Sequence, residues 1–404
     1  VTLQKTAEEV AAYLCGHGLD AKAYHAGFKP EMRSAIQDEF MAAPNSIVVA
    51  TIAFGMGIDK ADIRYVYHYN LPKSLENYSQ EIGRAGRDGL PSVCEVLVSD
   101  SDRIILENFT YGDTPDKESV DALVNQLLTK GESFDVSTYE LSTRFDIRPL
   151  VISTLLCYLE LGNFIQSSGP FYSQYKFQYL TDPQDILQRF SPERQAFLGG
   201  LFQNSKKARI WNTLDIDTCV TALGTTRQRI TAAINYLDDQ GLLKTQVSGL
   251  RLGFRRLQNN LEPSAVSDSL YGRFIDSETR DIERIRHLGK FVTSANCVVR
   301  SLLSYFGEDL GKGCGHCDRC LNEFTTSVPI ELKQSLDESE LAVIHEIHRE
   351  GHQALQTPRQ LAKFLCGISS PKTSRTRPSL SKHVHFGAFT QIPFQVVLQY
   401  SKEL

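Results

Sequence analysis

The 404-residue sequence lacks several features, and each absence excludes a class of protein or site. No run of 18 apolar residues occurs, which excludes a membrane-spanning helix. The first ten residues have neither a basic segment nor an apolar core, so they are not a secretory signal. No Gly-x-x-x-x-Gly-Lys-Ser/Thr or Asp-Glu-x-His sequence occurs, so the chain has no phosphate-cradling loop and no acid to hold nucleotide Mg²⁺. An initiating Met is also missing, which favours a fragment of a longer protein.

Neither sign of charge dominates, because 43 basic and 48 acidic residues give a net charge of −5. This balance excludes a uniformly basic nucleic-acid-binding protein but permits a local basic patch. Residues 351–402 contain no Asp or Glu, so we expect a local positive field there that attracts phosphate. The cations of this stretch are Arg359, Lys363, Lys372, Arg375, Arg377, Lys382 and Lys402.

The nine cysteines fall into two groups. Five occur singly in apolar stretches, which favours buried thiols in a reducing compartment over a disulfide framework. The other four have the spacing C-x16-C-x2-C-x2-C, which suits tetrahedral Zn²⁺ with no open position, and therefore a structural site. An iron–sulfur cluster, or His316 replacing one thiolate, are the alternatives. These four residues are Cys297, Cys314, Cys317 and Cys320.

Residues 1–112 alternate helix and strand patterns and predict an α/β lobe, a parallel sheet with helices on both faces. A capping box from Thr6 to Glu9 predicts a helix start, and Pro30 is expected to be a first helical residue. Residues 47–50 form a short apolar run typical of a strand buried on both faces. Residues 93–98 predict another strand.

Beyond the lobe, the sequence predicts mostly helical domains. Residues 113–180 have a helix over 120–128, a capping box at Ser137, a helix over 150–161 and a Gly169-Pro170 turn between two aromatic strands, which together are typical of a winged helix. Residues 181–262 weakly repeat this pattern, with a second capping box at Thr225; a chance echo is the alternative. Residues 263–330 predict a helical hairpin with the cysteine site, and residues 331–404 a small basic helical domain.

The string Tyr78–Gly89 (YSQEIGRAGRDG) carries two arginines, Arg84 and Arg87, each directly after a glycine. We expect them on one side of a helical turn, where glycines allow a partner to approach closely. Paired guanidinium groups suit the γ-phosphate of a nucleotide, so both are candidate arginine fingers acting on a nucleotide held elsewhere. A surface salt-bridge cluster is the alternative interpretation.

Together with residues 23–27 (AYHAG) and 50–60 (ATIAFGMGIDK), this string resembles motifs of the RecQ family of ATP-dependent DNA helicases. The resemblance implies that residues 1–112 are the second of two RecA-like lobes and that the first lobe precedes Val1. It further implies ATP between the lobes and 3′→5′ movement on single-stranded DNA. The residues implied for γ-phosphate contact are Arg84 and Arg87, those for ATP binding Gln80, Asp59 and Gly83, and those for DNA binding Thr51, His25 and Lys5. For His25, a half-buried turn histidine is the alternative.

Residues 296–308 before the cysteine loop also resemble the helix leading into the RecQ zinc subdomain. The chain departs from the commoner family plan because roughly 180 residues separate the lobe from the zinc site. Aromatic rings at Phe171 and Tyr172 could stack on a base at a fork, or simply pack onto their own domain. Winged helices contact duplex DNA; the candidate phosphate contacts are Arg251, Arg255 and Arg256, then Lys206, Lys207 and Arg209, and in the C-terminal stretch Lys372, Arg375 and Arg377.

The sequence is therefore expected to be part of an ATP-dependent 3′→5′ DNA helicase of repair and recombination, inactive by itself, with structural Zn²⁺, ATP–Mg²⁺ and single-stranded or forked DNA as ligands. The alternatives are a DNA-binding protein that has lost its motor lobe, and an RNA helicase. We expect a nucleoid location in a bacterium or a nuclear one in a eukaryote, and no oligomeric state is indicated. His345, His348 and His352 share a helical face and are interpreted as surface histidines rather than a metal site.

Overall fold

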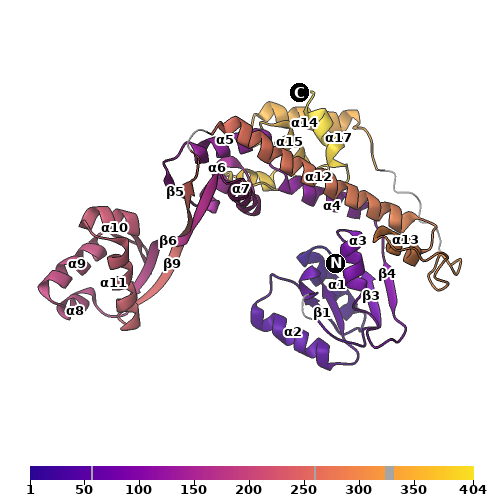
Figure 1. The fold of residues 1–404 in the computed structure, drawn as a ribbon, viewed down its shortest axis with the longest axis horizontal. Helices are drawn as coiled ribbons and strands as arrows, with labels where there is room; N and C mark the ends of the chain where they lie inside the picture. The colour runs from indigo at the N-terminus through magenta and orange to yellow at the C-terminus, as the bar shows by residue number, and fades with distance from the viewer. Residues whose placement is uncertain (56–57, 259–260, 324–331) are drawn as a thin grey trace. The chain divides into compact units, whose positions relative to one another are not determined.

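The computed structural model describes residues 1–55, 58–258, 261–323 and 332–404 (Figure 1). The chain divides into two compact units, one formed by Val1–Thr114 with Arg273–Leu404 and the other by Pro115–Gly272. The five-domain division stays a prediction. Among the described residues, no helix is long and apolar enough to cross a membrane.

The N-terminal part of the first unit alternates helices with parallel strands, as expected of an α/β lobe. β1 pairs with β2 and β3 with β4, each pair as a two-stranded parallel sheet. Pro30 is the first residue of its helix, as predicted. The elements are α1 (Gln4–Gly16), β1 (Ala21–Tyr24), α2 (Pro30–Ala42), β2 (Ile47–Ala50), η1 (Ile52–Phe54), β3 (Tyr65–His68), α3 (Leu75–Ile82) and β4 (Val93–Val96).

Two local predictions for this lobe are wrong. α1 begins at Gln4, so Thr6 lies inside the helix rather than capping it. Residues 47–50 were expected to be buried on both faces of the strand, but in β2 only Val49 is buried and Ile47 is exposed. Among the described residues β2 pairs only with β1, so it lies at the edge of its sheet.

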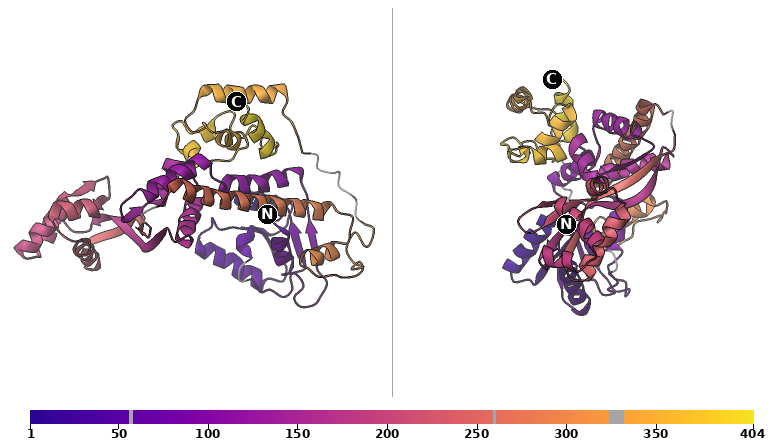
Figure 2. Two further views of the ribbon diagram at one scale, coloured as in Figure 1. Left: turned by 45° about the horizontal axis from the view of Figure 1, so that its top comes forward. Right: turned by 90° about the vertical axis from the view of Figure 1, so that its left-hand side faces the viewer.

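The rest of the first unit is helical. Figures 1 and 2 show α4 running alongside α12, and a cavity of about 490 Å³ lies between these helices and α3. Tyr111 stacks on Phe394 with ring centroids 4.3 Å apart in the core of this unit. The elements are α4 (Asp100–Asp113), α12 (Pro263–Thr293, which belongs to this unit from Arg273 onward), α13 (Val298–Tyr305), α14 (Glu338–Glu350), α15 (Pro358–Leu365), α16 (Pro371–Arg375), η2 (Leu380–Lys382) and α17 (Phe394–Ser401).

The acid-free C-terminal stretch is less basic at its surface than its composition predicts. Lys363 is buried, and its Nζ donates to the carbonyl of Thr114 at 2.8 Å. Arg359 forms a largely buried ion pair with Glu278. Two of the seven cations therefore hold α15 in place instead of facing solvent.

The second unit is built around one antiparallel sheet with strand order β5-β9-β6-β8-β7. Figure 1 shows β6 and β9 as a long ribbon with helices at each end. Its elements are α5 (Lys117–Leu128), β5 (Ser133–Val136), α6 (Thr138–Phe145), α7 (Pro149–Leu161), β6 (Ile165–Tyr179), α8 (Pro183–Gln188), α9 (Pro192–Gln203), β7 (Ser205–Lys207), β8 (Asn212–Asp215), α10 (Ile216–Leu223), α11 (Arg227–Asp239) and β9 (Leu243–Arg256).

The predicted wings are wrong in detail. Gly169 and Pro170 lie within β6 next to a bulge, because both pair with β9 and the chain does not reverse there. The second hairpin is likewise absent, since residues 243–256 are one strand. The second cap is Thr226 rather than Thr225, because the Thr226 side chain accepts the N–H of Arg229.

The weak repeat, by contrast, is matched element by element. α6 and α10 each have 8 residues and begin at 138 and 216, while α7 and α11 each have 13 and begin at 149 and 227, an offset of 78 in both cases. Glu160 accepts the N–H of Ser167 at 2.7 Å, and Asp238, 78 positions later, accepts that of Thr245 at 3.0 Å. The first copy of the repeat runs from β5 to β6 and the second from β8 to β9, and each copy begins with a short strand, here called its leading strand. These leading strands are exchanged, because β5 pairs with β9 of the second copy and β8 pairs with β6 of the first.

Candidate nucleotide site, zinc centre and DNA interface

Arg84 and Arg87 lie in consecutive turns that follow α3. The helix is capped at its start by Ser74, whose Oγ accepts the N–H of Asn77 at 3.3 Å, and it ends at Ile82. The prediction that both arginines lie on a helical turn is therefore wrong. The helix is capped at Gly83, and three residues later Gly86 adopts φ +61°, where an added Cβ would lie 2.8 Å from the carbonyl oxygen of Leu90.

The loop between Gly83 and Ser92, here called the arginine loop, is held against β3. The N–H of Gly86 donates to the carbonyl of Ile63 at 3.0 Å, and the Arg64 guanidinium forms an ion pair with Asp88. At the other end of β3, His68 is buried and contacts Glu81 of α3 at 2.6 Å. These contacts fix the backbone from which the two arginines project, so little ordering entropy remains to be lost when a ligand binds.

The two guanidinium groups have different surroundings. Arg84 is partly buried: its Nη1 donates to the carbonyl of Ile58 at 3.5 Å, its Nη2 packs close to Gly55, and its buried Nε has no partner among the described residues. Arg87 is exposed and forms an ion pair with Asp59 at 2.5 Å, although Asp59 itself is 85% exposed. An exposed ion pair contributes little stability, so a phosphate could displace Asp59 at small cost.

The other predicted nucleotide residues lie on or beside the arginine loop. Gln80 is exposed in the last turn of α3, and Gly83 is the residue at which that helix is capped. Asp59, Arg84 and Arg87 are thus brought together with them, whereas Met56 and Gly57 of the quoted motif lie outside the described residues. The arrangement offers several N–H donors to an anion at one edge of the lobe.

The predicted DNA residues of this lobe occupy the carboxyl ends of β1 and β2. Tyr24 is in register with Ala50, so His25 and Thr51 follow at one edge. His25 is only 4% exposed, its Nε2 contacts Glu8 at 3.0 Å, and its Nδ1 accepts the N–H of Gly27 at 3.2 Å. The ring therefore shapes its own turn, as in the alternative interpretation, and we do not carry it forward as a direct DNA contact.

Thr51 and Lys5 remain predictions. Thr51 precedes η1; its N–H donates to the carbonyl of Tyr24 at 3.1 Å, and its side chain makes no capping bond to the helix. Lys5 is 84% exposed on α1 and pairs with Glu9 at 3.4 Å. Neither side chain is engaged strongly enough to prevent a contact with phosphate.

The four predicted zinc ligands converge. All four sulfur atoms lie within 4.8 Å of one another, with Cys317 and Cys297 3.8 Å apart and Cys314 and Cys320 4.0 Å apart. Four thiolates around one Zn²⁺ at bonds of about 2.3 Å would be about 3.8 Å apart, so the donor set fits. His316 points its Nδ1 at the Cys314 carbonyl, 3.0 Å away, and is not in the group.

The protein environment prepares one thiol for metal binding. Cys297 caps α13; burial acts to raise the pKa of its thiol, but N–H groups of Arg300 and Cys314 directed at the sulfur outweigh burial and lower this pKa to about 6. The loop is fastened to the end of α12 by Arg319, which donates to the carbonyls of Val292 at 2.9 Å and Ser294 at 3.3 Å. Sequence reasoning missed Arg319, although its position between two ligands could have indicated it.

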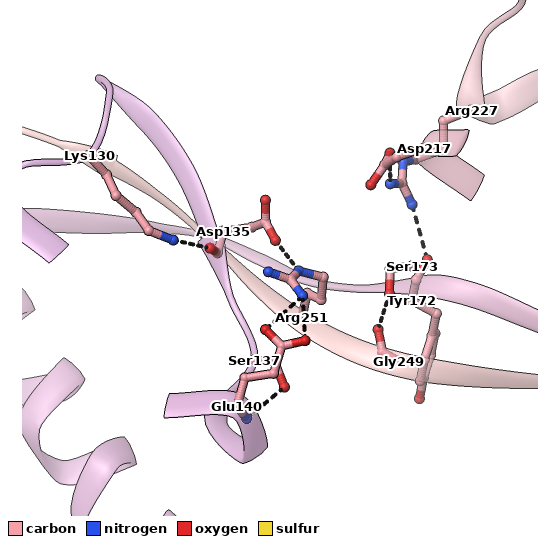
Figure 3. A network of polar contacts seen from close by, with 10 residues as sticks. All are labelled: Lys130, Asp135, Ser137, Glu140, Tyr172, Ser173, Asp217, Arg227, Gly249 and Arg251. Atoms are coloured by element: carbon pink, nitrogen blue, oxygen red, sulfur yellow. Dashed lines mark hydrogen bonds and ion pairs between the residues drawn. The ribbon is translucent and has the colours of Figure 1, made fainter. Parts of the chain in front are cut away.

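In the second unit, Arg251 lies at the centre of a polar network (Figure 3). Its guanidinium forms ion pairs with Asp135 of β5 and with Glu140 in the first turn of α6, the latter at 3.2 Å. Two carboxylates neutralise this charge and the side chain is only 24% exposed, so it ties the ribbon to α6. We therefore do not carry Arg251 forward as a phosphate contact; Arg255, which contacts Gln166 at 3.0 Å, stays a prediction.

The predicted fork residues are not at the tip of a wing. Arg227 of α11 covers the ring of Phe171 at 4.7 Å, donates to the carbonyl of Tyr172 at 3.0 Å and pairs with Asp217 at 2.5 Å (Figure 3). Phe171 is thus packed onto its own domain, which was the alternative to stacking on a base. The Tyr172 ring is 44% exposed in the middle of the ribbon.

Around α16, the three predicted cations differ. Lys372 and Arg375 are partly buried and engaged in interactions, and only Arg377 is exposed. A role for this stretch in DNA binding stays a prediction, with Arg377 the best placed of the three.

Comparison with known proteins agrees with these sites. Residues 1–89 match the model of the helicase conserved C-terminal domain, which contains the arginine loop up to Gly89, and residues 268–321 match the RecQ zinc-binding model, which contains all four cysteines. Both regions therefore resemble the RecQ family of helicases. The chain is 25% identical to ATP-dependent DNA helicase Q-like 5 of Arabidopsis thaliana over 98% of its own length and 44% of that protein.

Higher identity is confined to a shorter region. The chain is 52% identical to RecQ-like DNA helicase blm-1 of Caenorhabditis elegans over 26% of its length, and 49% identical to ATP-dependent DNA helicase Q5 of Rattus norvegicus over 25%. Each match covers 10% of the relative. The chain therefore spans less than half the length of these curated relatives.

Proposed function

We propose that this chain forms part of a RecQ-type, ATP-dependent 3′→5′ DNA helicase of repair and recombination. Arg84 and Arg87 would contact the γ-phosphate of ATP held with Mg²⁺ by a further lobe, and their charge would stabilise the transition state of hydrolysis. The observation that carries this proposal is the pair of guanidinium groups, Arg84 and Arg87, presented from one loop whose backbone is fixed. Two such groups on one rigid loop suit a phosphate, whose charge is spread over several oxygens.

Arg87 would join once ATP displaces Asp59. Because Asp59 is exposed and faces the same space, it could instead bind the nucleotide ribose after it releases Arg87. Zn²⁺ in the four-cysteine site would be structural and would fix the loop around Arg319 to α12.

For duplex DNA, we propose that α11 rather than α7 faces the nucleic acid. The exposed residues of α11 include Gln228, Arg229 and Asn235, side chains that hydrogen-bond to base edges and phosphates. The exposed face of α7 has Leu150 and Leu161 at 71% and 67% exposure and no charge between them apart from the partly buried Glu160. The neighbouring hairpin between β7 and β8 adds Lys206, Lys207 and Arg209.

The test uses the full-length protein that contains the further lobe. Arg84→Ala should lower the DNA-stimulated kcat for ATP by about 10³-fold, the lower end for an arginine finger, while DNA affinity measured without nucleotide stays unchanged. Arg280→Ala, which removes an exposed arginine of α12, is the matched control and should leave kcat unchanged. If Arg84→Ala retains wild-type hydrolysis, the proposed role of the arginine loop is wrong and the DNA-binding alternative gains support.

A further inference from the structure

Imidazole and carboxylate groups gather where α14 ends. Glu350 Oε2 lies 2.8 Å from His352 Nε2 and 3.4 Å from His383 Nε2, and the three donor groups lie within 4.8 Å of one another. This is not the helical-face group considered from the sequence, because His345 and His348 are exposed and do not take part. The third donor, His383, comes instead from the segment that contains η2 and follows α16.

The fold holds both segments in place. Gly351 caps α14 with φ +63°, so the chain turns back and brings His352 onto the carboxylate that precedes it. The segment with His383 is fastened to α15 by two backbone hydrogen bonds, from Gly387 to Phe364 at 3.1 Å and from Phe389 to Leu365 at 2.8 Å. The donors are therefore presented by anchored backbone on both sides.

The local electrostatics favour a cation at this point. Glu346 and Glu350 lie in the last turns of α14, where the negative end of the helix dipole disfavours a carboxylate and favours a positive charge. A second pair reinforces the first, because His385 Nε2 lies 3.3 Å from Glu346 Oε2. Two carboxylates at the carboxyl end of a helix, each facing an imidazole, form an environment that a divalent cation would stabilise.

We propose that Glu350, His352 and His383 bind a divalent transition metal ion such as Zn²⁺. Two imidazoles and one carboxylate are a donor set that zinc accepts, with a fourth position left for water. Bonds of about 2.1 Å in a tetrahedral site place donors about 3.4 Å apart, as Glu350 and His383 already are, so His352 must move outward by about half an ångström. His383 Nδ1 accepts the N–H of His385 at 3.3 Å; binding through Nε2 moves the ring proton to Nδ1 and opens that contact.

The ion would fasten the 380–385 segment to α14. This role is separate from the nucleotide site and from the four-cysteine centre, so it stands or falls independently of the proposed helicase function. In its absence the same residues form hydrogen bonds between carboxylate and imidazole, which explains how the group can pack before the metal arrives.

The test is the zinc content of the 404-residue chain after exhaustive dialysis against buffer with micromolar Zn²⁺. We expect two zinc ions per chain for the wild type and one for His383→Gln and for His352→Gln. The matched control His345→Gln, on the same helix but outside the group, should retain two. One zinc per wild-type chain, with no change in the two variants, would overturn the proposal.

A spectroscopic measurement covers the case in which a variant folds poorly. With the cysteine site filled by Zn²⁺, one equivalent of Cu²⁺ should give an electron paramagnetic resonance spectrum with coupling to two nitrogen nuclei. His352→Gln, which alters a partly exposed side chain, should reduce this to one nitrogen. A spectrum of wild-type protein without nitrogen coupling, or one that His352→Gln leaves unchanged, would contradict the assignment.

Discussion

Replacement of Gly86 by Ala tests whether the arginine loop depends on its backbone geometry. An L-residue at φ +61° costs about 1 kcal/mol more than glycine. The new Cβ would also lie 2.8 Å from both the Leu90 carbonyl oxygen and the Ser92 hydroxyl, so backbone must shift, which adds about 1–2 kcal/mol. We expect Gly86→Ala to reduce the local stability of the loop by about 2–3 kcal/mol.

The same loop provides the control. Gly89 has φ +79° but nothing within 4 Å of an added Cβ, so Gly89→Ala should cost only the backbone strain, about 1 kcal/mol. Hydrogen exchange read by mass spectrometry on peptides from 83 to 92 measures the local opening free energy directly, which matters because the chain has two units and need not unfold in one step.

The two substitutions should also differ in their effect on ATP hydrolysis. In the full-length protein, Gly86→Ala should lower DNA-stimulated ATP hydrolysis more than Gly89→Ala, because the first displaces the backbone between Arg84 and Arg87. Equal protection from exchange in both variants would refute the steric argument. Equal hydrolysis despite unequal protection would show that the loop position does not control the arginines.

Four further outcomes are expected. Cys297→Ser should remove one bound zinc ion and make the 297–321 segment susceptible to proteolysis, as zinc analysis and limited digestion would show. Arg251→Ala should destabilise the second unit and leave the salt dependence of DNA binding unchanged, whereas a released phosphate contact would lower that slope by about one. Leu159→Ala and Leu237→Ala, both fully buried at equivalent positions of the repeat, should each cost about 3 kcal/mol in denaturant unfolding; a negligible cost at either would contradict the equivalence. The Ser339 hydroxyl, the Glu340 N–H and Lys333 hold the pKa of Asp337 below its usual range. The stability that Asp337 contributes to α14 is therefore complete above about pH 4 and is lost as the pH falls. Asp337→Asn should remove this acid dependence when the loss of helix is followed by circular dichroism.

The sequence carried enough information for the sites made of short, contiguous motifs. The zinc ligands could be predicted because three of them lie within one tight loop and their spacing alone limits the geometry. Arg84 and Arg87 could be singled out from their glycine-flanked string, but their predicted helical turn is wrong. The chain beyond α3 is held by the bond from the Gly86 N–H to the Ile63 carbonyl, which no local pattern contains.

Contacts between distant residues could not be predicted. Arg251 appears in the sequence as one of several exposed cations, and only the pairing of β9 with β5 brings it to Asp135. Lys363 and Arg359 were counted as free charges because their partners lie 249 and 81 positions away. Gly169-Pro170 resembles a turn by composition, but thirteen paired positions between β6 and β9 override that preference.

The exchange of leading strands between the two copies has a consequence for how the second unit could have arisen. The first copy alone would leave β5 and the whole of β6 without a strand partner, because both pair with strands of the second copy, and an unpaired edge is prone to associate with another chain. Two separate copies would satisfy each other as a closed two-fold dimer, each lending its leading strand to its neighbour. The present chain has the form of such a dimer joined end to end, so cutting it between Tyr179 and Pro183 should yield two fragments that reassemble rather than two independent domains.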